Sequence, residues 1–181
     1  MQKVIKKIFN KKASPVLIAE ISANHNGSIK KAKRLILTAK KNGADLVKLQ
    51  TYEPRNMTIN SSQKDFLVKD GLWKGYKLWD LYQEAQTPLK WQKELFDYAK
   101  RIKIPCCSTP YDDEGVDLLK KLNSKLYKVS SFEMKDSSLV KKICSIGKPV
   151  IISTGLANLN EISEVYKVAK KTGCKKLILL Y

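Results

Sequence analysis

The chain has 181 residues with 35 Lys+Arg against 17 Asp+Glu, a formal net charge of +18, and 43% of its residues are hydrophobic. This composition fits a single globular domain and excludes wholesale disorder, and no apolar run approaches the ~18 residues of a membrane helix. The lysines are scattered over several helix-like segments without an aromatic RNA-binding motif or a Cys/His finger, so we predict solvated helix faces and no nucleic-acid partner.

Short apolar runs alternate with helical patterns along the chain. Strands are predicted at residues 16–19, 46–50, 104–107, 126–130, 149–153 and 177–180. The first helix begins after Ser28, which can cap it, and can end at Gly43. The second opens at Thr87 and has Pro88 at its first position. Three more helices are centred on residues 116–122, 139–143 and 162–169.

Six strands joined by five main helices predict a parallel α/β sheet, either a barrel or a doubly wound layer. The connection from Thr51 to Gln86 is longer than the others. Its apolar and aromatic residues predict an extra helix that folds over one end of the sheet.

Cysteine and histidine usage limits the metal chemistry. Cys106, Cys107, Cys144 and Cys174 lack CxxC spacing, which predicts buried free thiols in a reducing cytoplasm. A cysteine zinc site is not expected, and His25, the single histidine, cannot by itself complete a two-histidine metal site. The start of the chain is basic but has no apolar signal-peptide core. We expect a cytoplasmic protein that does not attach to a membrane.

Polar side chains follow each predicted strand, and parallel α/β folds place functional groups at the carboxyl ends of strands. The candidates are Glu20, Asn24, His25, Lys48, Gln50, Ser108, Thr109, Lys128, Ser131, Glu133, Ser153 and Thr154. Lys48 and Lys128 interrupt apolar strands, where an unpaired charge is costly, so they are predicted to bind a phosphate or carboxylate. Three alternatives stay open. The lysines could lie at a solvent-exposed edge of the sheet, and Glu20 and Glu133 could have only the structural role of pairing with them. His25 could be a loop residue that does not contact a substrate.

Several motifs resemble the sialic-acid synthase family, in that family's order, from about Val16 onward. They are residues 18–21 (IAEI), 24–27 (NHNG), 43–50 (GADLVKLQ), 108–110 (STP), 127–133 (YKVSSFE) and 148–155 (KPVIISTG). Residues 71–73, 81–82, 87–88 and 130–133, together with Ala85, are most similar to the pseudaminic acid synthase branch.

The resemblance implies a TIM (β/α)8 barrel that condenses phosphoenolpyruvate with an amino-sugar aldehyde to a nine-carbon sialic-type acid plus phosphate. By motif, Lys48, Gln50, Thr109, Lys128, Ser131 and Ser153 would bind phosphoenolpyruvate. Glu20 and Glu133 would be the catalytic carboxylates, and Asn24 and His25 would lie near the sugar. A divalent cation, Mn²⁺ or Mg²⁺, is expected in the full-length enzyme, with no ligand from this chain. The full-length enzyme is expected to be a homodimer.

Residues 1–181 hold about six of the eight barrel strands, so we interpret them as the N-terminal portion of one barrel domain. The family's C-terminal antifreeze-like domain is not among them. The expected sugar is a 2,4-diacetamido-trideoxy hexose, giving pseudaminic acid. The alternatives are N-acetylneuraminate or legionaminate synthesis, an inactive fragment of such an enzyme, or an aldolase with a Schiff-base lysine.

Overall fold

The computed structural model describes residues 1–10 and 12–181 and contains a six-stranded sheet. Every strand pairs in parallel with the next one along the chain, in the order β1 to β6. The strands are β1 (Ile18–Glu20), β2 (Leu46–Thr51), β3 (Cys106–Pro110), β4 (Tyr127–Val129), β5 (Val150–Ser153) and β6 (Leu177–Leu180). The sheet curls as part of a barrel wall, and this confirms the incomplete TIM-barrel fold.

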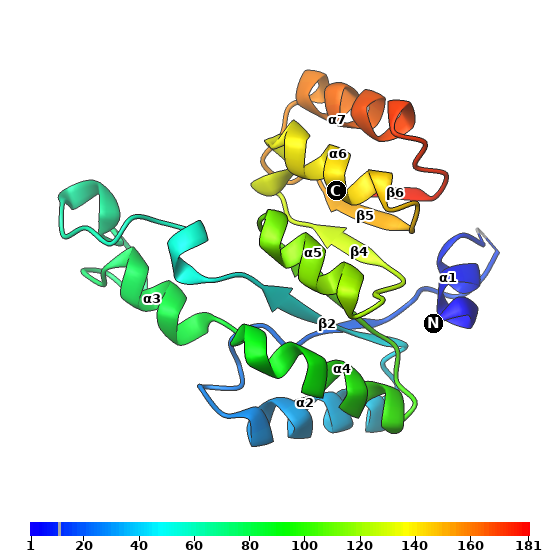
Figure 1. The fold of residues 1–181 in the computed structure, drawn as a ribbon, viewed down its shortest axis with the longest axis horizontal. Coiled ribbons are helices and arrows are strands. Elements are labelled where there is room, and N and C mark those ends of the chain that lie inside the picture. Colours follow the sequence, from blue (N-terminus) through cyan, green and yellow to red (C-terminus); the bar gives the residue numbers. More distant parts are fainter. Residues whose placement is uncertain (11) are drawn as a thin grey trace.

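Five helices cover the outer face of this sheet, as Figure 1 shows. They are α2 (Ile29–Lys41), α4 (Leu89–Arg101), α5 (Asp113–Lys121), α6 (Ser137–Ser145) and α7 (Leu159–Lys171). Ser28 caps α2 as predicted, and Asp112, Asp136 and Asn158 cap α5, α6 and α7 with their side chains. These caps begin each helix just after the carboxyl end of a strand, as a βα-barrel requires.

Alternate residues of each strand face opposite sides of the sheet. The outward residues, such as Val47 of β2 and Val129 of β4, pack against the five helices in two hydrophobic clusters. The inward residues change character along the strands. Near the amino ends they are apolar, whereas Lys48 and Lys128 follow further along, toward the carboxyl ends. One half of the inner face is therefore core, and the other half is polar.

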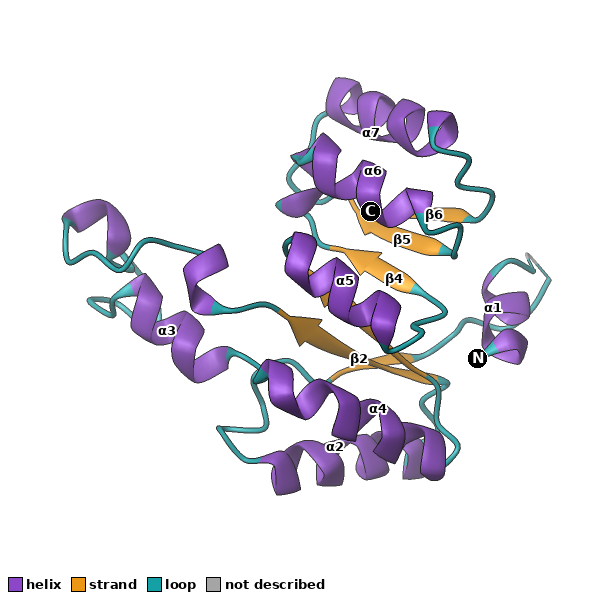
Figure 2. Cartoon of the chain, viewed as in Figure 1, coloured by secondary structure: helices purple, strands orange, loops and turns teal. Residues whose placement is uncertain are grey.

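A short helix, α1 (Gln2–Ile8), packs against the apolar half of the inner face. Its Val4 is buried in a cluster with Leu46, Leu126 and Ile151. Figure 2 shows α1 near one end of the strands and α3 beyond the other. The sequence reasoning did not predict this helix, because its basic residues dominate the pattern and its buried face is narrow.

The connection between β2 and α4 contains the predicted extra helix, α3 (Leu78–Ala85), and two short 3₁₀ turns, η1 (Pro54–Asn56) and η2 (Lys64–Phe66). The prediction that this segment folds over one end of the sheet was wrong. Figure 1 shows it as an arm that projects away from the strands. Within it, η1 contacts α3, and Tyr52 lies edge-on to Tyr82. Arg55 and Asn56 of η1 also bind Glu114 and Asp112 at the start of α5.

Two boundaries also differ from the prediction. The third strand begins at Cys106, two residues later than expected, so Ser108 and Thr109 lie within it. The carbonyl of Pro105 accepts a hydrogen bond from Val47 N–H. Proline has no N–H to donate, so Pro105 cannot complete the pairing with β2. Pro88 has an extended ψ of 133°, so it is the N-cap residue and α4 begins at Leu89.

Candidate active site

Glu20 and Lys48 form an ion pair at the carboxyl ends of β1 and β2, where the strand register sets them side by side. Lys48 Nζ also donates a hydrogen bond of 3.3 Å to Thr109 Oγ1 on the neighbouring β3. Glu20 Oε1 accepts a hydrogen bond of 3.0 Å from the backbone N–H of Ser22. Three adjacent strands therefore bring one carboxylate, one ammonium and one hydroxyl into contact.

Lys128 forms a second polar group on the same inner face. Its Nζ donates hydrogen bonds of 2.6 Å to Ser153 Oγ on β5 and 2.6 Å to the carbonyl of Val129. Burial and then the positive charge of Lys48 lower the pKa of Lys128 to about 8. Burial raises the pKa of Cys107, which lies opposite Lys48 in the pairing of β2 with β3, to about 12. The two ammonium groups thus act on each other across β3, with a neutral thiol beside them.

The loop after β4 brings Ser131 and Glu133 to this end of the sheet. Ser131 Oγ lies 3.4 Å from the position that a Cβ on Gly155 would occupy, so the loops after β4 and β5 touch. Glu133 begins the turn η3 (Glu133–Lys135), and its buried Oε2 has no hydrogen-bond partner among residues 1–10 and 12–181. Burial raises the pKa of Glu133, and the charge of Lys128 partly opposes this. The surroundings of Glu133 therefore favour the protonated form of its carboxyl more than water does.

Tyr111 is a site residue that the sequence reasoning missed. Gln50 Nε2 donates a hydrogen bond of 3.2 Å to Tyr111 Oη, and the Tyr111 ring lies edge-on to Tyr52 at 5.3 Å. Burial, followed by the charges of Glu133 and Glu20, raises the pKa of the Tyr111 phenol. The available signal was its position directly after the Ser-Thr-Pro strand end.

The two residues predicted near the sugar lie in the loop after β1, and the structure does not join them to the lysines. Asn24 Nδ2 donates a hydrogen bond of 3.1 Å to the Ile21 carbonyl. His25 is fully buried, with Nε2 3.2 Å from Thr87 Oγ1 and Nδ1 accepting from Gly27 N–H at 3.2 Å. Burial lowers its pKa. In this arrangement His25 holds the loop against α4, which matches the alternative of a loop histidine.

We tested whether the chain's own side chains fit the divalent cation that the resemblance implies. Among residues 1–10 and 12–181, no group of three or more His, Cys, Asp or Glu side chains gathers as a metal site. The four cysteines are buried and free, as predicted. No side chain in the described part of the chain is therefore assigned as a ligand of that cation.

No helix in the described part of the chain is long and apolar enough to cross a membrane.

Comparison with known proteins gives a consistent result. Residues 35–181 match the NeuB family. Pseudaminic acid synthase of Campylobacter jejuni (serotype O:2) is 41% identical over 172 residues, which cover 95% of this chain. N,N'-diacetyllegionaminic acid synthase of the same strain is 39% identical and covers 89% of this chain. The crystal structure of N-acetylneuraminic acid synthetase from Leptospira borgpetersenii is similar with a TM-score of 0.77 and 26% identity.

These matches involve only part of each relative. The chain covers 50% of the pseudaminic acid synthase, 48% of the legionaminic acid synthase and 53% of the Leptospira structure. The match to the Leptospira structure covers 92% of this chain. The chain thus spans about half the length of the curated relatives that it matches.

Proposed function

Because this chain belongs to the NeuB family, whose members here include pseudaminic, legionaminic and neuraminic acid synthases, we propose that it forms the phosphoenolpyruvate-binding part of such a synthase. The reaction joins phosphoenolpyruvate to an amino-sugar aldehyde and releases phosphate. The observation that carries the proposal is the pair of inward lysines, Lys48 and Lys128, with hydroxyl groups beside both.

Each part of phosphoenolpyruvate has a matching group in this arrangement. The two lysines would bind its phosphate and carboxylate, which are both anionic. Thr109, Ser131 and Ser153 would complete the hydrogen bonds, and Gln50 would position the enol. The methylene carbon of phosphoenolpyruvate then attacks the aldehyde carbon, and the aldehyde oxygen takes up a proton. Water adds to the resulting oxocarbenium carbon, and the bond between that carbon and the phosphate oxygen breaks.

The two carboxyl groups have different surroundings, which assigns them different roles in this proposal. Glu20 is ion-paired with Lys48, so its carboxylate would stabilise positive charge on the oxocarbenium carbon. Glu133 is half-buried, its Oε2 has no hydrogen-bond partner in the described part of the chain, and its pKa is raised, so it would transfer the proton.

The remaining partners are proposed from the family. The sugar would be a 2,4-diacetamido-trideoxy hexose that approaches from the loop carrying Asn24 and His25. The whole enzyme would use Mn²⁺ or Mg²⁺ held by residues outside this chain, and it would act as a cytoplasmic homodimer.

Phosphate release tests the proposal. A protein that carries these residues within a whole barrel is mixed with Mn²⁺, phosphoenolpyruvate and the diacetamido sugar, and the bridging oxygen of phosphoenolpyruvate is labelled with ¹⁸O. We expect phosphate release with the label in the phosphate, since the carbon–oxygen bond breaks. Parallel reactions with N-acetylmannosamine and the legionaminic precursor distinguish the alternative products. Absence of sugar-dependent phosphate release with all three sugars contradicts the proposal.

Replacing Glu133 by glutamine should lower turnover by roughly 10²–10⁴-fold, because the amide cannot transfer the proton. Binding of phosphoenolpyruvate should change much less. The measurements are kcat for phosphate release and a calorimetric Kd, with Glu164→Gln on the exposed face of α7 as the control. Unchanged kcat in Glu133→Gln would remove the proton-transfer role.

The affinity for phosphoenolpyruvate should fall as the pH rises from 7 to 9.5. The pKa of Lys128 is about 8, so its ammonium form holds the anion below that pH and is lost above it. A Lys128→Arg variant stays charged across this range and should show a flatter profile, whatever its absolute affinity. Calorimetric titrations at several pH values measure both profiles, and parallel profiles would exclude Lys128 as the titrating group.

A further inference from the structure

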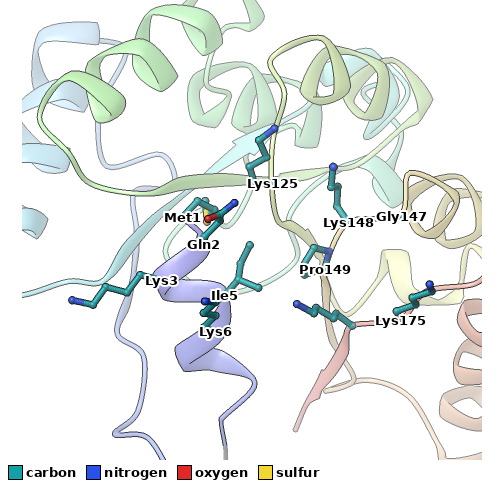
Figure 3. Close-up of a pocket in the computed structure, with 11 residues that line it drawn as sticks. Met1, Gln2, Lys3, Ile5, Lys6, Lys125, Gly147, Lys148, Pro149 and Lys175 are labelled. Atoms are coloured by element: carbon teal, nitrogen blue, oxygen red, sulfur yellow. The ribbon is translucent and has the colours of Figure 1, made fainter.

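A pocket of about 1010 Å³ lies at the other end of the sheet, between α1 and the segments that lead into β4, β5 and β6. Figure 3 shows the side chains of this pocket, which we call the lysine pocket. Its lining residues are Met1, Gln2, Lys3, Ile5, Lys6, Lys125, Gly147, Lys148, Pro149, Lys175 and Lys176. Six of these eleven residues are lysines, and no lining residue is acidic.

The lysines of this pocket come from four separate parts of the chain. Lys3 and Lys6 belong to α1, although Lys3 points away from the others in Figure 3. Lys125 precedes β4, Lys148 precedes β5, and the pair 175–176 precedes β6. Since the amino ends of parallel strands meet at one edge of the sheet, the fold itself gathers charges that are far apart in the sequence.

These lysines also lack anionic partners. Among the described residues, none of the six lysines forms an ion pair. A second basic pocket, on α2 and α4, differs in this respect: there Lys33 pairs with Glu94, and Lys93 pairs with Asp97. Lys125 donates only to the neutral Asn123, and Lys176 lies 5.9 Å from the Phe9 ring. Uncompensated like charges in one concave site repel one another, and an anion bound among them relieves that repulsion.

The shape and composition of the lysine pocket favour a small ligand over a nucleic-acid strand. Its volume lies at the upper end of the range for small-molecule sites, about 300–1,000 Å³. It has no lining aromatic residue on which bases could stack and no arginine. Ile5, Met1 and Pro149 add an apolar surface between the ammonium groups. Several separate ammonium groups match the successive phosphates of a polyphosphate.

We propose that the lysine pocket is an anion site for a polyphosphate group, carried either by inorganic polyphosphate or by a nucleoside triphosphate. The site is separate from the pair formed by Lys48 and Lys128, because it lies at the amino ends of the strands and that pair lies toward their carboxyl ends. A ligand here would also clamp α1 onto the loops that precede β4, β5 and β6.

Isothermal titration of a protein that carries these residues within the whole barrel, with tripolyphosphate at low salt, tests this site. The variant Lys148→Gln with Lys175→Gln removes two lysines of the pocket. The control, Lys30→Gln with Lys31→Gln, removes the same charge from two exposed residues at the start of α2. We expect binding to weaken at least about tenfold in the pocket variant and less than about twofold in the control. Circular dichroism checks that both variants fold.

Three further arms decide the source and the place of binding. Tighter binding of ATP than of tripolyphosphate assigns the site to a nucleotide, and equal binding assigns it to the phosphate chain. The variant Lys48→Ala should keep the tripolyphosphate binding that the pocket variant loses, and loss of that binding in Lys48→Ala would move it to the candidate active site. Loss of that binding in Lys48→Ala overturns the proposal. It is also overturned if the pocket variant and the control lose the same affinity for tripolyphosphate, or if the unchanged protein does not bind tripolyphosphate. Tight binding of a single-stranded 20-nucleotide DNA without tripolyphosphate binding would also overturn it.

Discussion

Replacing Lys48 or Lys128 by alanine, in a protein that carries the whole barrel, is expected to weaken phosphoenolpyruvate binding by about 2–5 kcal/mol. Each variant removes one ammonium group from a partly buried set of polar contacts. In Lys48→Ala the carboxylate of Glu20 loses its ion-pair partner and repels the incoming anion. In Lys128→Ala the hydroxyl of Ser153 loses its donor.

Calorimetric titration with phosphoenolpyruvate measures this loss, and the KM for phosphoenolpyruvate provides an independent check. The control is Lys30→Ala, at an exposed position with the same change of charge. If both lysine variants bind as tightly as the unchanged protein, the anion is held elsewhere and the proposed mechanism has no basis. A double variant shows whether the two lysines act on one ligand, because their effects should then not be additive.

A polypeptide of residues 1–181 alone is expected to have no synthase activity and to associate with itself. The outer edges of β1 and β6 have no paired strand in the described structure, and such edges template further pairing. Apolar side chains are also accessible there, with Ile18 37% and Leu180 42% exposed. Closing a barrel of this type requires eight strands, so the site would lack part of its wall.

The comparison is between this polypeptide and one extended through the remaining barrel. Phosphate release from phosphoenolpyruvate, with the diacetamido sugar and Mn²⁺, measures activity, and gel filtration with light scattering measures association. The extended protein should turn over substrate, and the short one should elute as oligomers. A short chain that is monomeric, unfolds cooperatively and releases phosphate would show that six strands suffice.

Apolar runs and helical periodicity are local signals, so the alternation of six strands and five covering helices could be predicted from the amino-acid sequence. The sequence also identified Lys48 and Lys128, because a charge inside an apolar strand is recognisable without knowing its neighbours. Ser28 was recognised as a helix cap for the same reason: a cap acts on residues three positions away.

Which side chains meet could not be predicted in this way, because it depends on how the strands pair. The pairing of Glu20 with Lys48, the contact of Gln50 with Tyr111 and the burial of His25 against Thr87 join residues up to 62 positions apart. The lysine pocket arises in the same way, from segments that each resemble an ordinary solvated helix or loop. Pattern reasoning follows the periodicity of one segment, whereas parallel strand pairing superimposes distant segments at one edge of the sheet. This superposition creates both polar sites of the protein.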